Sequence, residues 1–85
     1  MANSASSKKR IRQTETRTQR NRAQRSRLRT AVKRVLSADD AAQAQEELVR
    51  TAAMLDRYAA RRLIHPNKAA RKKSQLARHV QELAG

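Results

Sequence analysis

The side chains that could carry acid–base or metal chemistry are few and far apart. His65 and His79 stand fourteen residues from each other, with no cluster of carboxylates near either. Asp39 and Asp40 suit helix capping better than acid–base catalysis, which needs a partner group within hydrogen-bonding reach. The absence of cysteine excludes disulfides, thiolate nucleophiles and Cys-based zinc sites, and the single glycine excludes a glycine-rich phosphate loop. We therefore expect a protein that is not an enzyme, with no cofactor, metal or small-molecule substrate.

Arginine and lysine, in contrast, are abundant. The 85 residues hold 21 of them against seven acids, a formal net charge of +14. Residues 8–29 contain ten of these cations and one acid, Glu15, with no glycine or proline. The electrostatic field of so much positive charge opposes compaction of the isolated chain and attracts polyanions. Fifteen of the cations are arginine, whose planar fork favours bidentate contacts to phosphate. The charge pattern predicts a partner made of nucleic acid.

The scarcity of aromatic residues narrows the kind of nucleic acid. Tyr58 is the only aromatic residue, whereas proteins that grip single-stranded bases stack them on several aromatic side chains. We therefore expect structured RNA or DNA, held through its phosphates. His65 can donate a hydrogen bond to RNA from a loop. Further hydrogen bonds to phosphate and 2′-hydroxyl groups are expected from Asn3, Gln19, Asn21, Gln24, Ser26, Thr30 and Asn67.

The predicted first helix, over about residues 6–36, has two different parts. At about 100° per residue, an apolar arc forms only in its last two or three turns. Upstream, Ile11 is the one large apolar residue, and the arginines point to nearly every side. The first five or so turns should therefore project. The whole helix, at about thirty residues, would be a rod about 45 Å long. The arc comprises Leu28, Ala31, Val32, Val35 and Leu36.

Two shorter helices follow, over about residues 40–62 and 66–83. Asp39 or Asp40 should cap the second helix, since Asp40 and Gln43 have capping-box spacing, and Pro66 should open the third. The second helix holds most of the acids, and a second basic cluster (Lys68, Arg71, Lys72, Lys73, Arg78) lies in the third. The apolar faces predicted are Leu48, Ala52, Leu55 and Ala59 in the second helix, and Leu76, Val80 and Leu83 in the third, where Ala70, Ala77 and Ala84 should allow close approach.

These elements predict an all-α fold: a three-helix antiparallel bundle with a long, projecting N-terminal helix, forming one domain over residues 1–85. Half of the apolar residues are alanine, 16 against 16 larger ones. A core of that size leaves a short domain marginally stable. We expect binding to the partner to stabilise the fold.

Other readings of the same composition are weaker. No apolar run approaches the ~20 residues of a membrane span, and the basic helix lacks the broad apolar face of a membrane-active peptide. The basic N-terminus has no apolar segment typical of a secretory signal. It shares its arginine content with mitochondrial transit peptides, but the basic character recurs near the C-terminus, so we expect no membrane partner and a cytoplasmic protein. Composition alone leaves open a DNA-compacting, nucleoid-type protein.

Two groups of residues resemble the motifs of one known family. The first comprises Met1-Ala2-Asn3, Ser6-Ser7-Lys8-Lys9-Arg10, Asn21 and Ser26-Arg27-Leu28-Arg29-Thr30. The second is Leu63-Ile64-His65-Pro66-Asn67-Lys68-Ala69-Ala70-Arg71-Lys72-Lys73-Ser74. In type, order and separation they resemble the bacterial small-subunit ribosomal protein S-twenty family. The likeness covers nearly the whole chain and is weakest through the second helix.

The resemblance implies a structural protein of the small ribosomal subunit in the cytoplasm. It implies direct binding to 16S ribosomal RNA, with contacts to the 5′ domain and the 3′ minor domain, and a role in 30S assembly and translation. Two departures stand out, since family members often have glycine at the position of Arg62 and lysine at that of Pro66. Family pattern and charge together predict RNA contacts from Lys8, Lys9, Arg10, Arg12, Arg17, Arg20, Asn21, Arg22, Arg25, Ser26, Arg29, Thr30, Lys33, His65, Asn67, Lys68, Arg71, Lys72 and Lys73.

Overall fold

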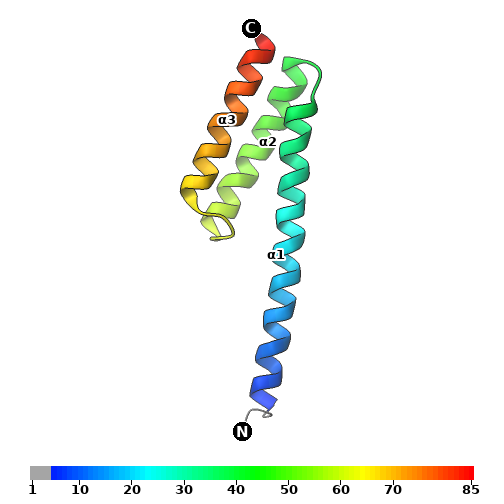
Figure 1. Ribbon diagram of the computed structural model, residues 1–85, viewed down its shortest axis with the longest axis vertical. Coiled ribbons are helices and arrows are strands. Elements are labelled where there is room, and N and C mark those ends of the chain that lie inside the picture. The colour runs from blue at the N-terminus through cyan, green and yellow to red at the C-terminus, as the bar shows by residue number, and fades with distance from the viewer. Residues whose placement is uncertain (1–4) are drawn as a thin grey trace.

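Three α-helices make up the fold. The computed structural model describes the backbone of residues 5–85 and the side chains from Ser7 onward, so the contact predicted for Asn3 lies outside the described residues. The helices are α1 (Ala5–Ser37), α2 (Ala41–Ala60) and α3 (Pro66–Ala84). Figure 1 shows α1 and α3 both packed against α2, with successive helices antiparallel. No strand occurs in residues 5–85. The predicted fold class is confirmed.

The first helix is much longer than the bundle it joins. α1 has 33 residues and α2 has 20, which at 1.5 Å per residue gives about 50 Å against about 30 Å. Every side chain from residue 8 to 20 is exposed, including that of Ile11 at 59%. We call residues 5–20 the arm, and Figure 1 shows it extending beyond the other helices. It projects because Ile11 is the one large apolar side chain in residues 7–20, too little to hold this segment against the bundle.

The core is a small set of residues drawn from all three helices. Val35, Leu55 and Leu76 are at most 1% exposed and come from α1, α2 and α3 respectively. Leu28 and Val32 pack against this cluster from one side. Thr51 is also fully buried, and its hydroxyl donates to the Ala31 carbonyl oxygen of α1 at 3.4 Å. A hydroxyl residue is invisible to an apolar-periodicity search, so the sequence did not predict Thr51.

Several predicted core positions are wrong. Leu36 is 50% exposed and Leu83 is 39% exposed, because each lies at the last turn of its helix, where the bundle ends. Ala70, Ala77 and Ala84 are all exposed, whereas Ala69 is buried. Ala69 precedes Leu76 by seven residues and so shares its face, while Ala70 lies about 100° away.

The connection before α2 is capped as the sequence predicts. Asp40 adopts extended backbone angles (φ −121°, ψ 159°), and its carboxylate accepts a hydrogen bond from the Gln43 backbone N–H at 2.7 Å. This bond satisfies one of the N–H groups that the first turn of a helix leaves free. Of the two candidate caps, Asp40 is therefore the one used.

The connection after α2 differs from the predicted one. α2 ends at Ala60, two residues before the predicted end. Arg62 has φ 60°, the left-handed conformation that stops a helix. Its N–H donates to the Ala59 carbonyl at 3.0 Å, and the Leu63 N–H donates to the Tyr58 carbonyl at 2.9 Å. This pair of bonds defines a Schellman motif, so the chain makes the usual helix stop with arginine in place of glycine.

Candidate nucleic-acid interface

The cations of α1 are not compensated within the protein. Two ion pairs occur among the described residues, Lys73 with Asp56 at 2.8 Å and Arg50 with Glu47 at 3.7 Å, and neither includes α1. The first turn of α1 also has no acid, although the positive end of a helix dipole favours one. The long helix therefore carries a charge that only an external polyanion can neutralise.

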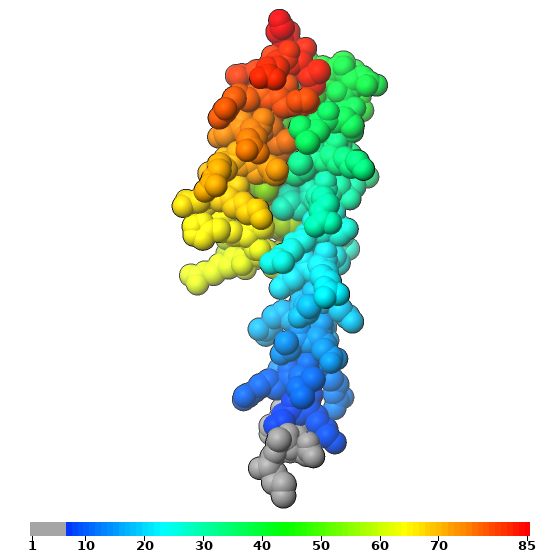
Figure 2. Space-filling view, in the orientation of Figure 1, coloured from blue at the N-terminus to red at the C-terminus, as the bar shows by residue number. Residues whose placement is uncertain are grey.

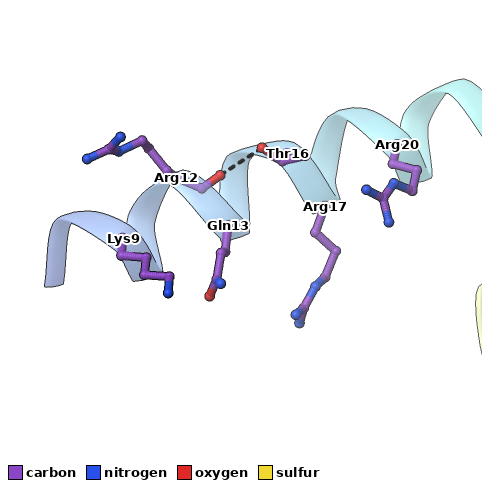
Figure 3. A pocket seen from close by; sticks show the side chains of 6 residues that line it. All are labelled: Lys9, Arg12, Gln13, Thr16, Arg17 and Arg20. Atoms are coloured by element: carbon purple, nitrogen blue, oxygen red, sulfur yellow. Dashed lines mark hydrogen bonds between the residues drawn. The ribbon is translucent and has the colours of Figure 1, made fainter. Parts of the chain in front are cut away.

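The arm presents its cations along a shallow groove. The groove is lined by Lys9, Arg12, Gln13, Thr16, Arg17 and Arg20, which Figure 3 shows in close-up. Arg12 and Arg17 extend to opposite sides of the helix in that view. From the first to the last of these residues the helix rises about 16 Å. Duplex nucleic acid carries a phosphate charge about every 1.7 Å of its axis, so this groove can meet several phosphates at once.

Two threonine hydroxyls of α1 donate hydrogen bonds to backbone carbonyls of the same helix. The hydroxyl of Thr30 donates to the Ser26 carbonyl at 3.0 Å, and that of Thr16 donates to the Arg12 carbonyl at 2.9 Å. A hydroxyl used this way keeps only its oxygen lone pairs for a partner. In this conformation Thr30 can accept from a 2′-hydroxyl but does not donate to a phosphate. Asn21 and Gln24 are half-buried. The other predicted residues of α1 outside the arm groove and the bundle end of the arm are exposed: Lys8, Arg10, Gln19, Arg22, Ser26 and Lys33.

The two basic segments of the sequence meet where the arm leaves the bundle. There, α1 and the α2–α3 connection enclose a cleft of about 610 Å³, which we call the arm–turn cleft. Figure 2 shows the α2–α3 connection standing beside the middle of α1. Residues from both family-like motifs line the cleft, although they are separated by more than thirty positions. Its lining comprises Arg25, Leu28, Arg29 and Val32 from α1, Leu55 from α2, and Leu63, Ile64, His65, Lys68 and Lys72 from the connection and α3.

His65 has a defined orientation at this cleft. It precedes Pro66 in an extended conformation (φ −70°, ψ 140°), as expected for a residue before proline. Its Nδ1 accepts the Asn67 backbone N–H at 3.1 Å and so caps α3. A neutral imidazole that accepts at Nδ1 carries its proton on Nε2. His65 therefore presents its Nε2–H as a hydrogen-bond donor, while the contact to RNA predicted for it stays a prediction.

The outer face of α3 forms a separate basic surface. Asn67 and Arg71 lie there together with Arg78, a residue of the second basic cluster that was not among the predicted RNA contacts. The spacing of Arg71 and Arg78, seven residues, places both on one face and could have identified it. Lys73, which was among those predictions, instead pairs with Asp56 across the α2–α3 contact.

Other kinds of site find no support in the described part of the chain. No group of three or more histidine or acidic side chains there could hold a metal ion. None of the three helices, over the residues described, has the length and apolar character to cross a membrane. Tyr58 is 7% exposed and so has no free ring face for a base. The basic surfaces of α1, of the arm–turn cleft and of α3 remain as the candidate site.

Comparison with known proteins identifies the family. A family model described as "Ribosomal protein S20" matches residues 2–81. The chain belongs to this family. It is 49% identical over 87 residues to the small ribosomal subunit protein bS20 of Coxiella burnetii (strain Dugway 5J108-111), covering 99% of this chain and 97% of that protein. It is 55% identical over 87 residues to the bS20 of Stenotrophomonas maltophilia (strain R551-3), covering 99% and 98%. The bS20 of Alkalilimnicola ehrlichii is 50% identical over 88 residues, covering both chains fully.

Family membership gives meaning to the departure at Arg62. The structure shows why glycine suits this position, since φ is 60° there and glycine adopts this conformation at no steric cost. The other departure, Pro66, occupies the first turn of α3, where a proline lacks only a backbone N–H that the helix would leave free. At these two positions the backbone forms a regular helix end, the Schellman motif at Arg62, and a regular helix start at Pro66.

Proposed function

We propose that this protein is a structural component of the small ribosomal subunit that binds 16S ribosomal RNA directly. The observation that carries the proposal is the uncompensated cationic arm, joined at the arm–turn cleft to a second basic surface, in a chain that belongs to the S20 family. The names of the relatives, small ribosomal subunit protein bS20, support the assignment to that subunit. The protein acts in the cytoplasm, by binding and without catalysis.

The arrangement suits insertion between RNA segments. The arm carries cations toward more than one side (Figure 3), so phosphates of two helices can approach it at the same time. The cleft and the outer face of α3 add cations at the point where the arm joins the bundle. We propose that these surfaces together reach the 5′ domain and the 3′ minor domain, and that the protein supports 30S assembly by holding the two in place.

All of the predicted RNA-binding residues enter this proposal, with different weights. Most lie on the arm, in the cleft or on the outer face of α3. Lys73 has the weakest case because Asp56 neutralises it. The acidic side chains of α2, including the exposed Glu46, should remain away from the phosphates.

A competition experiment separates this function from DNA compaction. The full chain is bound to labelled 16S RNA, and unlabelled 16S RNA or duplex DNA of matched phosphate concentration is then added. We expect duplex DNA to compete at least ten times more weakly, since specific complexes exceed non-specific ones by large factors. Equal competition by the two nucleic acids would favour a nucleoid-type protein instead.

Matched charge variants test which surface binds. Replacing Arg12, Arg17 and Arg20 by glutamine removes three charges from the arm, and replacing Arg50, Arg57 and Arg61 removes three from α2 and its end. All six side chains are exposed. We expect only the arm variant to lose most of its affinity for 16S RNA. Equal losses from both variants would mean that net charge, and not the arm, determines binding.

A further inference from the structure

The arm–turn cleft differs in kind from the other basic surfaces. Half of its lining is aliphatic and buried or half-buried, and we call this half the floor: Leu28, Val32, Leu55, Leu63 and Ile64. The other half is basic or donates hydrogen bonds and is mostly exposed, and we call it the rim: Arg25, Arg29, His65, Lys68 and Lys72. No carboxylate lines the cleft. The arm groove contains no aliphatic residue at all, and the groove on α3 contains only Ala70.

Phosphate alone does not explain this combination. A phosphate on the rim would leave the aliphatic floor facing water, which costs free energy in proportion to the apolar area. A fully paired RNA helix presents mainly sugar and phosphate at its surface, with the flat faces of its bases stacked inside. An apolar peptide would match the floor, but four cations without an acid give it no electrostatic attraction.

A nucleotide whose base is not stacked carries both an apolar face and negative charge, and it is the ligand with this combination that an RNA partner supplies. Such a base can lie flat on aliphatic side chains and against an arginine guanidinium plane, while its flanking phosphates meet the lysines and arginines. We propose that the arm–turn cleft binds a single unpaired RNA nucleotide, with the base on the floor and the phosphates on the rim. This inference rests on the proposed RNA-binding function and adds recognition of one base position to it.

The dimensions and the donor set agree with this occupant. The cleft encloses about 610 Å³, within the range of about 300–1,000 Å³ that small-molecule sites occupy. The Nε2–H of His65 supplies one directional donor, because Nδ1 is already engaged with the Asn67 N–H at 3.1 Å. A fixed donor beside an apolar floor is the arrangement that orients a ligand in such sites. The lack of exposed aromatic residues thus does not exclude contact with a base.

The test compares two RNAs on the full native chain. One is a short RNA duplex with a single bulged adenosine, and the other carries an abasic ribose at the same position, so that backbone length and charge are matched. We expect the chain to bind the adenosine bulge at least about five times more tightly, because this ratio of affinities corresponds to the free energy gained by stacking one base. Equal affinity for the two duplexes would overturn the inference without any variant being made.

Two variants then locate the preference. Leu63→Ser removes an aliphatic part of the floor, and Val49→Ser makes the same kind of change at a side chain that is 60% exposed on α2. We expect Leu63→Ser to lose the preference for adenosine and Val49→Ser to keep it, with circular dichroism verifying that both are helical. A preference that Leu63→Ser retains while folded would place the base elsewhere and overturn the inference.

A parallel measurement keeps this inference separate from the function on which it rests. Binding of the native chain to a 16S RNA 5′-domain transcript is recorded under the same conditions. Tight binding to the transcript with equal affinity for the adenosine and abasic bulges overturns only the cleft proposal. Failure to bind the transcript overturns the proposed function and this inference with it.

Discussion

Replacing Arg62 by glycine should stabilise the free protein. Arg62 has φ 60°, a conformation that brings the Cβ of an L residue close to a carbonyl oxygen at a cost of about 1–2 kcal/mol. Glycine avoids that cost but loses about 0.5–1 kcal/mol more conformational entropy on folding. The midpoints of these two ranges leave a net stabilisation of about 0.7 kcal/mol. In a domain of this size such a gain raises the melting temperature by about 2–8 °C.

Two control variants separate backbone relief from loss of charge. Arg62→Ala removes the same side chain and charge but keeps an L residue in the left-handed conformation. Arg61→Gly removes a charge one position earlier, where φ is −85° and glycine has no strain to relieve. We expect Arg61→Gly to lower the melting temperature because it only adds freedom to the unfolded chain.

The assay is thermal unfolding followed by circular dichroism at fixed ionic strength, so that screening of the net charge is constant. We expect Arg62→Gly to melt at the highest temperature of the three variants. If Arg62→Gly melts at the same temperature as Arg62→Ala or lower, the left-handed conformation costs no more than the conformational entropy that glycine loses on folding, and the predicted stabilisation is wrong.

Three further predictions concern the core, the cap and the charge. Leu55→Ala should lower the free energy of unfolding by about 2–5 kcal/mol, since Leu55 is 1% exposed, and Leu36→Ala by less than ~0.5 kcal/mol, since Leu36 is 50% exposed. Urea unfolding measures both losses, and losses of similar size would contradict the core assignment. Asp40→Ala should lower the free energy of unfolding by about 1 kcal/mol, and Asp39→Ala should change it little, because only Asp40 caps α2. A larger loss for Asp39→Ala than for Asp40→Ala in the same assay would refute the assignment of the cap. The logarithm of the 16S RNA binding constant should fall linearly with the logarithm of salt concentration, with a slope of about −0.7 to −0.9 per phosphate contacted; a flat curve in a filter-binding titration would exclude phosphate contacts as the basis of affinity.

The sequence predicted those features that depend on strong local signals. The single proline and the cap at Asp40 mark where helices begin, and they lie where predicted. The projection of the arm followed from the absence of large apolar residues other than Ile11 before Leu28. These features depend on one residue or one stretch, and tertiary contacts do not alter them.

The misjudged features depend on how the helices meet. Thr51 is buried because α2 lies between its two neighbours and its hydroxyl finds the Ala31 carbonyl, which no periodicity reveals. The end of α2 was placed too late because Arg62 takes a conformation that glycine usually supplies. The arm–turn cleft could not be predicted from either basic segment alone, since it forms only where α1 and the α2–α3 connection meet. Sequence reasoning identified the charges and missed the aliphatic floor between them.

Hydroxyl-radical footprinting on naked 16S RNA tests the central claim most directly. The full chain is added to the protein-free RNA at physiological salt, and backbone cleavage is read along the whole molecule. We expect discrete protection in both the 5′ domain and the 3′ minor domain, weakened when Arg12, Arg17 and Arg20 are replaced by glutamine. Absence of discrete protection, or diffuse protection spread over the RNA, would contradict direct and specific binding to 16S ribosomal RNA.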